Sequence, residues 1–491
     1  MTETLIIGAG PAGLTAAYEL TRLGRVARVL EQSRAIGGLS RTANYRGNRF
    51  DIGGHRFFTK MPEVSQVWRE LMGDDLLERE RLSRILYNNK FFHYPLRPVN
   101  ALLGLGVFES LRVMASYAQA RFVSNSRDET FEDWVCKRFG RRLFEIFFKT
   151  YTEKVWGIPC SEIGAEWASQ RIKNLNLGRA VLGAFKYGKV RDRKGGVITT
   201  LNDSFLYPRL GPGQMWERCR DVVAERGTDT VTGARVVKVR HARGRVVGVD
   251  AQMDDGSLQS FGGDEFLSTM PIKELFNCFD PQPPAEVLKA ANLLRYRDFL
   301  TVVLIVNRPD VFPDNWIYVH SADVQMGRIQ NYKNWSPEMV ADKGCTTLGL
   351  EYFVNRDSEL WHGSQDGLVA LGASECVKLG LIEPDEVLDG TVLRAEHAYP
   401  VYDRNYAGAL VTVREFLSTL TNLQSIGRNG QHRYNNQDHS MLTGMYAARN
   451  LAASADYDIW SVNTDPDYQE EGRLVHPDSG GRSTPRRLLQ T

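Results

Sequence analysis

The alternation of apolar and polar positions predicts a mixed chain of strands and helices that begins with a buried strand. Residues 4–7 are a short, apolar, β-branched run typical of a parallel strand, and residues 14–20 follow with a helical pattern. Residues 60 to about 185 look mostly helical, and aromatic residues recur there at helical spacing after a capping box predicted at Thr130 and Asp133. This long stretch therefore predicts a helical domain.

The second half of the chain reads mainly as strands. Residues 190–270 read as strands and turns, with a hairpin predicted around residues 241–244. Two apolar runs, 299–306 and 346–354, predict further strands, and residues 423–453 read as a strand, a glycine-rich loop and a final helix. The polar segment 456–491 predicts a mobile tail.

A glycine-rich turn joins the first strand to the first helix. Gly8, Gly10 and Gly13 have the spacing at which one glycine permits the tight turn, one admits a pyrophosphate and one lets helix and strand pack closely. A second strand ends in Glu31, the position from which an acid accepts hydrogen bonds from a ribose hydroxyl. The order of strand, loop, helix, strand and acid predicts a dinucleotide-binding unit.

Paired glycines that follow Glu31, the acid expected to bind the ribose, indicate which dinucleotide is bound. Gly37 and Gly38 resemble the second glycine motif of two-domain FAD oxidoreductases, and no second unit of this kind follows that would bind a nicotinamide nucleotide. We therefore expect FAD as the stable cofactor. The residues expected to hold it are Gly8, Gly10, Ala12, Gly13, Glu31, Gln32, Gly37, Gly38, Leu39, Gly54, His55, Arg56, Gly427, Asp438, Ser440 and Met441.

These patterns together predict an α/β fold, with a Rossmann-type FAD-binding domain, an inserted helical domain and an antiparallel-sheet substrate domain. We assign residues 61–189 to the helical domain and 271–399 to the sheet-containing substrate domain. The FAD-binding domain is expected to be discontinuous, comprising residues 1–60, 190–270 and 400–455.

Composition and charge narrow the classes of partner. The chain has 491 residues, and its 61 Lys and Arg against 59 Asp and Glu give a net charge of +2, which offers no electrostatic reason to expect nucleic acid or a membrane surface as a partner. Six scattered Cys without a CxxC motif predict reduced thiols, a cytoplasmic protein and no metal site. No apolar run approaches the roughly 18 residues of a membrane span. The sequence leaves a homodimer open.

Five segments in the middle and at the end of the chain resemble the UDP-galactopyranose mutases and occur in that family's order. They are Tyr151 to Gly157 with Arg171, Gly327 to Lys333, Leu350 to Tyr352, Ala398 to Val401, and Gly427 with Arg428 followed by Arg433 to Asp438. Taken singly, most of these segments match the family only loosely. As an ordered set with the glycine motifs, they extend the resemblance over residues 1 to about 455.

The resemblance implies roles for individual residues. Trp156 would stack on uracil, and Arg171 and Arg328 would bind the diphosphate. Tyr352 and Tyr434 would donate hydrogen bonds to phosphate oxygens. His55 would lie beside the flavin and complete a catalytic set with the two arginines. The remaining substrate-binding residues are Tyr207, Tyr399 and Asn436, and Asn436 stands where the family usually has Asp.

The resemblance also implies the reaction. The family interconverts the pyranose and furanose forms of a UDP-sugar, and N5 of reduced FAD attacks the anomeric carbon. FAD would thus be active in its reduced form, with NAD(P)H open as a transient reductant.

Two other classes of protein stay open. The glycine motifs alone fit an FAD oxidase or desaturase of the amine-oxidase or protoporphyrinogen-oxidase type equally well. A flavin-binding protein with a structural or regulatory role is the third reading.

Overall fold

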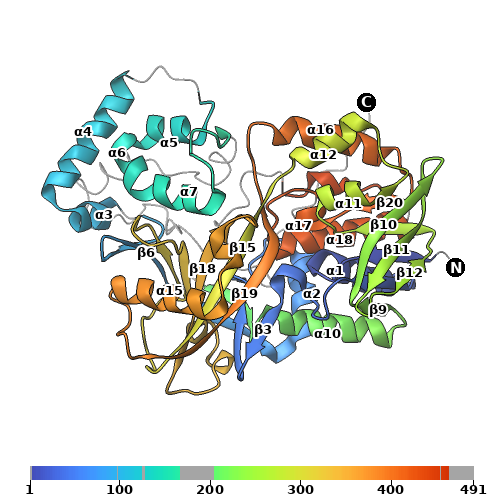
Figure 1. Ribbon diagram of the computed structural model, residues 1–491, viewed down its shortest axis with the longest axis horizontal. Coiled ribbons are helices and arrows are strands. Elements are labelled where there is room, and N and C mark those ends of the chain that lie inside the picture. Colours follow the sequence, from blue (N-terminus) through green and yellow to red (C-terminus); the bar gives the residue numbers. More distant parts are fainter. Residues whose placement is uncertain (1–2, 97, 124–127, 166–203, 454, 464–491) are drawn as a thin grey trace, which may run out of the picture.

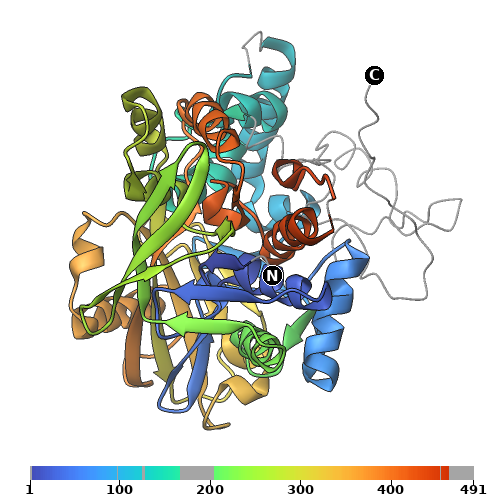
Figure 2. The same cartoon turned by 90° about the vertical axis from the view of Figure 1, so that its right-hand side faces the viewer.

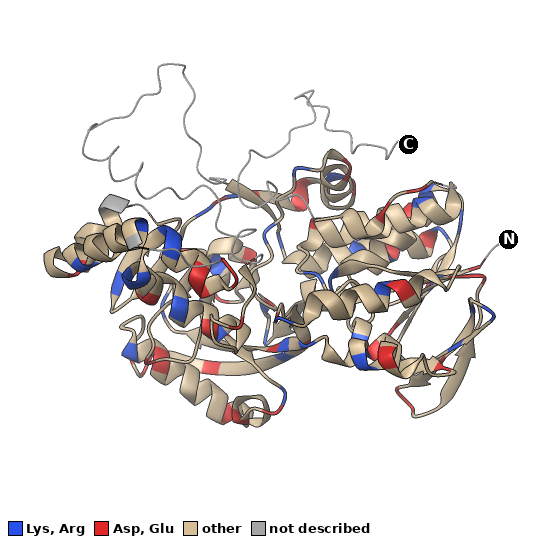
Figure 3. Ribbon diagram, turned by 90° about the horizontal axis from the view of Figure 1, so that it is seen from above, with Lys and Arg blue, Asp and Glu red and all other residues tan. Residues whose placement is uncertain are grey.

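A computed structural model describes residues 3–463 of the protein, except 97, 124–127, 166–203 and 454. Three units lie side by side (Figure 1): a parallel sheet with its helices, a large mixed sheet, and a helical unit at the opposite end of the molecule. Lys and Arg are interspersed with Asp and Glu along the ribbon of all three (Figure 3). The α/β fold class predicted from the sequence is confirmed.

The parallel sheet has the order β20-β13-β1-β2-β9. Its strands are β1 (Thr4–Ile7), β2 (Ala27–Glu31), β9 (Asp229–Thr232), β13 (Glu265–Ser268) and β20 (Leu423–Ser425). Side chains alternate across a sheet, so Ile6 packs into one hydrophobic layer while Leu5 and Ile7 pack into the other. Because both faces are covered, the first strand reads as a continuous apolar run.

Helices fill the first layer, and Figure 2 shows them grouped against the strands. They are α1 (Pro11–Arg22), α2 (Pro62–Met72), α10 (Pro212–Glu225) and α18 (Gln437–Ala452). The second layer contains a four-stranded sheet of β10 (Ala234–Ala242), β11 (Arg245–Met253), β12 (Leu258–Phe261) and β14 (Phe279–Asp280), with α11 (Ile272–Cys278), α12 (Ala285–Leu293) and α16 (Tyr406–Ser418). β10 and β11 form the hairpin that the sequence predicted.

The large sheet has seven strands in the order β19-β15-β18-β17-β16-β6-β7. They are β6 (Ser83–Tyr87), β7 (Lys90–His93), β15 (Tyr296–Val306), β16 (Trp316–Val319), β17 (Arg328–Asn331), β18 (Thr346–Val354) and β19 (Val387–Pro400). All neighbours are antiparallel except β16 and β6. Helix α15 (Gln365–Lys378) packs on one face, which leaves the other face available to a site. Smaller elements border the sheet: α13 (Tyr332–Trp335) and α14 (Glu359–His362).

The helical unit consists of α3 (Pro98–Leu105), α4 (Val107–Val123), α5 (Phe131–Phe139), α6 (Arg141–Phe144), one π-helical turn (Glu145–Lys149) and α7 (Thr150–Trp156). The capping box at the start of α5 is confirmed: the Asp133 N–H donates to Thr130 Oγ1 at 3.1 Å, and the Thr130 N–H donates to Asp133 Oδ2 at 3.2 Å.

Three expectations about elements need correction. The stretch 60–185 is less helical than predicted, because it also contains β6, β7 and β5 (Leu76–Glu80), which pairs with β8 (Ser204–Pro208). The stretch 190–270 contains α10, which the strand pattern missed. The predicted tail does not begin at 456, because Ile459 and Val462 are buried against the first hydrophobic layer; its remainder, 464–491, lies outside the described residues.

Candidate functional site

One large cavity lies where the three units meet, with a volume of about 1230 Å³. Its wall is formed by the carboxyl ends of β1 and β2, the free face of the seven-stranded sheet and the inner side of the helical unit. A typical single-ligand pocket has roughly 300–1,000 Å³. The cavity therefore has room for more than one small ligand.

The glycine-rich turns bring two backbone segments together at the β1 end of the cavity. The Gly37 N–H donates to the Ala9 carbonyl at 2.8 Å, and a Cβ placed on Gly38 would lie 3.2 Å from the Gly10 Cα. Helix α1 starts at Pro11 directly beside them, so its free N–H groups and positive dipole end point at the same space. The two segments form a cradle that can accommodate a pyrophosphate. Side chains larger than glycine would fill this space.

Gly13 and Gly37 shape this cradle without lining the cavity. A Cβ on Gly13 would lie 2.0 Å from the Gly8 carbonyl oxygen, so this glycine allows the close packing of helix and strand. Gly37 adopts a left-handed φ of 95° that directs the chain back toward Ala9.

Glu31 stands at the end of β2 as the sequence predicted. Its carboxylate accepts hydrogen bonds from the Ala9 N–H (2.7 Å) and the Ser33 N–H (2.9 Å). Burial raises the pKa of Glu31, while these backbone donors and the charge of Arg41 oppose the increase. Arg41 also lines the cavity, and sequence reasoning missed it although it directly follows the second glycine motif.

These groups fit FAD. The cradle matches a pyrophosphate, Glu31 matches a ribose, and Arg41 adds a positive charge near both. Of the other residues expected to bind the cofactor, Gly8, Ala12, Gln32, Leu39, Gly54, His55, Arg56, Gly427, Asp438 and Ser440 line the same cavity.

The start of α18 forms the opposite wall. Asn436 is its N-cap and lines the cavity, with the Asn436 N–H donating to His439 Nδ1 at 3.3 Å. Burial raises the pKa of Asp438 to about 7. Met441 does not line the cavity, because its sulfur accepts the Trp68 indole N–H at 3.0 Å within the core.

The charges of two arginines act on His55, which lines the same cavity. Burial, together with the charges of Arg428 and Arg328, lowers the pKa of His55 to about 4. The imidazole is therefore neutral at physiological pH and adds no charge of its own.

Arg328 is held by a buried carboxylate. β17 and β18 pair so that Arg328 lies directly opposite Glu351, and the guanidinium donates through Nε to Glu351, which also accepts from Gln330 Nε2 at 2.7 Å. Burial alone would lower the pKa of Arg328, but Glu351 raises it well above its usual value. A second guanidinium nitrogen donates to Tyr399 Oη at 3.3 Å.

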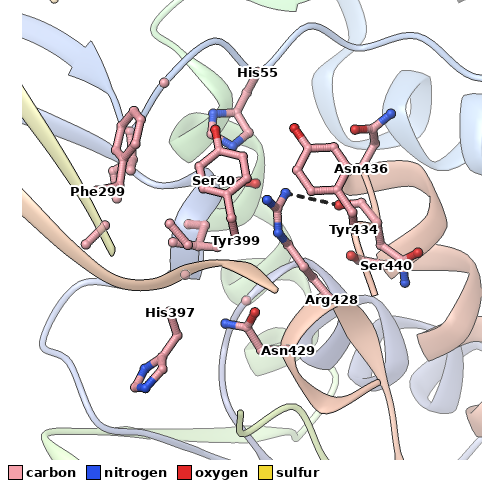
Figure 4. A pocket seen from close by; sticks show the side chains of 18 of the residues that line it. Ser40, His55, Phe299, His397, Tyr399, Arg428, Asn429, Tyr434, Asn436 and Ser440 are labelled. Atoms are coloured by element: carbon pink, nitrogen blue, oxygen red, sulfur yellow. Dashed lines mark hydrogen bonds between the residues drawn. The ribbon is translucent and has the colours of Figure 1, made fainter. Parts of the chain in front are cut away.

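Arg428 is a functional candidate that sequence reasoning did not select. Its guanidinium lies 4.3 Å from the Tyr434 ring centroid and 4.8 Å from that of Tyr399, and the two rings stack with centroids 5.5 Å apart. Figure 4 shows it extending between the tyrosines toward His55. Among the described residues no carboxylate forms an ion pair with it, and its Nε has no hydrogen-bond partner. The Gly-Arg dipeptide at 427–428 was the available signal.

Trp156 is less accessible than a stacking platform should be. It lines the cavity at the end of α7, but only 3% of its surface is exposed, and Tyr402 stacks on it with ring centroids 6.1 Å apart. The cavity wall also has an aromatic part, called here the aromatic arm, formed by Tyr151 of α7 with Tyr318 of β16 and His320 directly after it. Tyr151 stacks on His320 there, with ring centroids 4.9 Å apart.

Two predicted substrate ligands do not reach the cavity. Tyr352 follows Glu351 on β18 and so faces the opposite side of the sheet, where its hydroxyl donates to Glu375 Oε2 at 2.9 Å. Tyr207 is fully buried and donates to Asp51. Both placements remove these tyrosines from the candidate set. Arg171 lies outside the described residues.

The fold and the site define the class: an FAD-dependent flavoenzyme. The family model of flavin containing amine oxidoreductases matches residues 11–345, and the chain belongs to this family. Family membership implies FAD as the cofactor, and it gives no support to NAD(P)H as a reductant.

Curated relatives match short parts of the chain. A probable UDP-galactopyranose mutase of Klebsiella pneumoniae is 27% identical over 173 residues, which are 33% of this chain and 42% of that protein. An inactive all-trans-retinol 13,14-reductase of Danio rerio is 47% identical over 51 residues, 10% of this chain and 8% of that protein. The alignments thus span less than half of these curated relatives.

Solved structures match nearly the whole chain. A reduced UDP-galactopyranose mutase superposes with a TM-score of 0.79 at 21% identity, covering 95% of this chain and 98% of the other. A putrescine oxidase variant superposes with a TM-score of 0.61 at 14% identity, covering 92% and 99%. Identities this low show a shared fold.

The described residues show neither a membrane-spanning helix nor a metal-binding cluster. None of the helices there combines the length and apolar composition needed to cross a lipid bilayer. Nor do the described residues gather three or more His, Cys, Asp or Glu side chains into a cluster that would bind a metal ion.

Proposed function

We propose that the protein is a flavin-dependent nucleotide-sugar mutase that interconverts the pyranose and furanose forms of a UDP-sugar. The observation that carries this proposal is the pair of guanidinium groups, Arg328 and Arg428, that both contact Tyr399 and line the cavity with His55. A sugar diphosphate is anionic, and guanidinium groups bind phosphate oxygens in a bidentate manner. The similarity to a mutase structure supports the proposal.

Each residue of the site has its own role in binding the ligand, set by its position. Glu351 fixes the orientation of Arg328, so this guanidinium can hold a phosphate without first losing side-chain entropy. Tyr399 and Tyr434 flank Arg428 and offer hydroxyl donors to the same ligand. Arg171 remains a predicted further phosphate ligand.

The base belongs in the aromatic arm. Trp156, Tyr151 and Tyr318 all line the cavity, but Trp156 is buried whereas the two tyrosines are partly exposed. Stacking of a base on an aromatic ring contributes roughly 1–3 kcal/mol. We therefore place the uracil against these tyrosines.

Reduced FAD bound in the glycine-rich cradle would supply the nucleophile for the anomeric carbon, with no net oxidation. The arginines would retain the released UDP close to the sugar, so that its return is effectively intramolecular. The neutral His55 can donate or accept one hydrogen bond beside the sugar without adding repulsion between charges.

The test is product analysis by NMR. FAD-loaded protein, reduced with dithionite, is incubated with a panel of UDP- and dTDP-sugars. We expect pyranose and furanose forms to interconvert only with reduced enzyme, without stoichiometric consumption of dithionite. An unchanged sugar ring in every case, together with a flavin spectrum insensitive to UDP at millimolar concentration, would contradict the proposal.

The family description favours a second candidate, an FAD oxidase acting on an amine or a related substrate. The site argues against a cationic amine, because Arg428 already occupies the faces of Tyr399 and Tyr434 where an ammonium would bind. Oxygen consumption and peroxide formation in air, with no added reductant, would establish the oxidase instead.

A further inference from the structure

Lys154 of α7 holds a loop of the seven-stranded sheet, although it does not itself line the cavity. The loop comprises residues 320–327 and joins β16 to β17. The Lys154 ammonium donates to the carbonyls of Ser321 at 2.7 Å and Met326 at 3.0 Å. A third, longer hydrogen bond of 3.4 Å reaches the carbonyl of Val319. An ammonium group offers three donors, so this one lysine ties both ends of the loop to the helical unit.

A carboxylate of α15 holds the same loop. Glu375 is buried, and it accepts hydrogen bonds from the N–H groups of Gln325 at 2.5 Å and Met326 at 3.1 Å. Burial lowers the pKa of Lys154 to about 8, and the charges of Glu375 and Asp323 oppose this decrease. The ammonium is therefore charged at neutral pH. A cation on the carbonyl groups and an anion on the N–H groups together fix the loop.

The loop connects residues that the proposed function uses. Tyr318 and His320 of the aromatic arm lie at its β16 end, and Arg328 begins β17 at its other end. The third residue of the arm, Tyr151, lies one helical turn before Lys154 on α7 and stacks on His320 with ring centroids 4.9 Å apart. Lys154 thus links the part of the arm on α7 to the part on the sheet.

We propose that Lys154 is a positioning residue for the base of the nucleotide: it holds α7 and the 320–327 loop at the separation at which the base packs in the aromatic arm. The inference rests on the proposed function, which places the uracil there. Aromatic rings attract one another over a narrow range of separations and angles, so a shift of one half of the arm weakens the contact. Arg328 needs no such support, because Glu351 orients its guanidinium.

The helix stays attached to the sheet when the ammonium is removed. Arg297 of β15 donates to the carbonyls of Lys154 at 3.3 Å and Val155 at 3.4 Å, at the C-terminal end of α7. A cation at this end also interacts favourably with the helix dipole. Lys154→Met keeps a flexible, unbranched side chain and removes the charge and the donors. We therefore expect this variant to fold and to bind FAD.

The first experiment compares two ligands of the FAD-loaded protein by isothermal titration calorimetry. Lys154→Met should weaken UDP binding roughly tenfold, because it disturbs the stacking of the base. Inorganic pyrophosphate, which has no base, should bind with the wild-type affinity. A general loss of structure would instead lower both affinities.

The matched control is Lys333→Met. The Lys333 ammonium also donates to three carbonyls, those of Pro309, Lys343 and Cys345, but Lys333 does not line the cavity or contact the 320–327 loop. This variant should bind UDP and pyrophosphate as the wild type does.

Hydrogen exchange measured by mass spectrometry tests the contact without any nucleotide. In Lys154→Met the amides of residues 320–327 should exchange several-fold faster than in the wild type, because the loop opens more often. In Lys333→Met their exchange should not change. Unchanged exchange of the loop in Lys154→Met would overturn the inference.

The binding data separate this inference from the proposed function. If the wild type binds UDP and Lys154→Met binds it equally well, or loses UDP and pyrophosphate affinity to the same extent, the positioning role is refuted and the proposed function stands. If the wild type does not bind UDP at millimolar concentration, the proposed function is refuted, and the role of Lys154 in placing the base is refuted with it.

Discussion

At the scale of single residues, the orientation of the Arg328 guanidinium depends on the neighbouring carboxylate of Glu351. Glu351 is fully buried, and its two oxygens are taken by Arg328 and Gln330. Arg328→Ala removes a charged hydrogen bond to the ligand, which contributes about 1.5–3 kcal/mol. We therefore expect a loss of roughly 10- to 100-fold in UDP affinity, measured by titration of the flavin absorbance spectrum.

The variant also leaves Glu351 buried without its partner, so a control must separate affinity from stability. Arg84 offers one, because it is similarly buried and binds Asp314 through two nitrogens, on a part of β6 outside the cavity. Arg84→Ala should lower the melting temperature much as Arg328→Ala does, while UDP affinity stays at the wild-type value. Equal losses of affinity in both variants would show that Arg328 acts only through the fold.

The buried carboxyl group of Asp51 should make the free energy of unfolding depend on pH. Burial raises the pKa of Asp51 to about 7, although hydrogen bonds from Tyr207 and Thr42 oppose the increase. The folded protein then binds more protons at Asp51 than the unfolded chain from about pH 4 to about pH 7, so the Asp51 contribution to stability falls as the pH rises through that window. Above the window the contribution no longer changes.

Asp51→Asn cannot ionise, so its melting temperature should fall less than that of the wild type between about pH 5 and about pH 8. Part of the dependence will remain, because Asp438 titrates in the same range. Asp255→Asn changes an exposed carboxylate and serves as the control, with the wild-type pH profile. An identical profile in Asp51→Asn would refute the assignment.

At the scale of elements, the crossing of α1 and α18 sets the geometry of the cofactor site. A Cβ on Gly444 would lie 2.3 Å from the Ala12 carbonyl oxygen and 3.1 Å from the Ala16 nitrogen, so the two helices touch through backbone. Helix α1 begins at the pyrophosphate cradle and α18 begins at the opposite wall. Any separation of the two helices therefore widens the site between their N-termini.

Gly444→Ala should consequently lower the ratio of FAD to protein that survives gel filtration, and overpacking of this kind costs about 1–3 kcal/mol. Gly408→Ala is the matched control, because it lies in helix α16 with nothing within 4 Å of the added Cβ. That variant should retain FAD and melt at or above the wild-type temperature. Full FAD retention in Gly444→Ala would show that the crossing tolerates a methyl group.

The elements also explain how far the sequence could predict the site. The elements formed by the first forty residues are neighbours in sequence as well as in space. Strand, turn, helix and Glu31 lie within one βαβ unit, so their spacing alone defines the cradle. Glu351 and Tyr352 are adjacent, yet they face opposite sides of β18, and only the pairing of β18 with β17 shows which one contacts Arg328. Arg428 and Tyr399 come from different elements, so their contact exists only in the folded chain.

The same limit explains why the sequence did not predict the strands β5, β6 and β7. Their short runs lie between helices. β5 and β6 are stabilised by partners far along the chain, β8 and β16, and β7 pairs with β6. Periodicity within a window of a few residues carries no information about such partners.

At the scale of the whole molecule, the cavity depends on all three units at once. Glu31 comes from the parallel sheet, Arg328 from the seven-stranded sheet and Tyr151 from the helical unit. A ligand that spans them is bound by the folded arrangement and by no single unit. Binding must therefore stabilise the entire fold by mass action.

A thermal-shift panel on FAD-loaded protein tests this coupling and the charge of the site together. UDP at roughly 100 times its dissociation constant should stabilise the protein by about 2.7 kcal/mol, and the melting temperature should rise. Uridine, which lacks the phosphates, should give a much smaller rise, and a diamine should give none, because Arg328 and Arg428 repel a cation. A rise with the diamine and none with UDP would reverse the charge assigned to the ligand and favour the oxidase over the mutase.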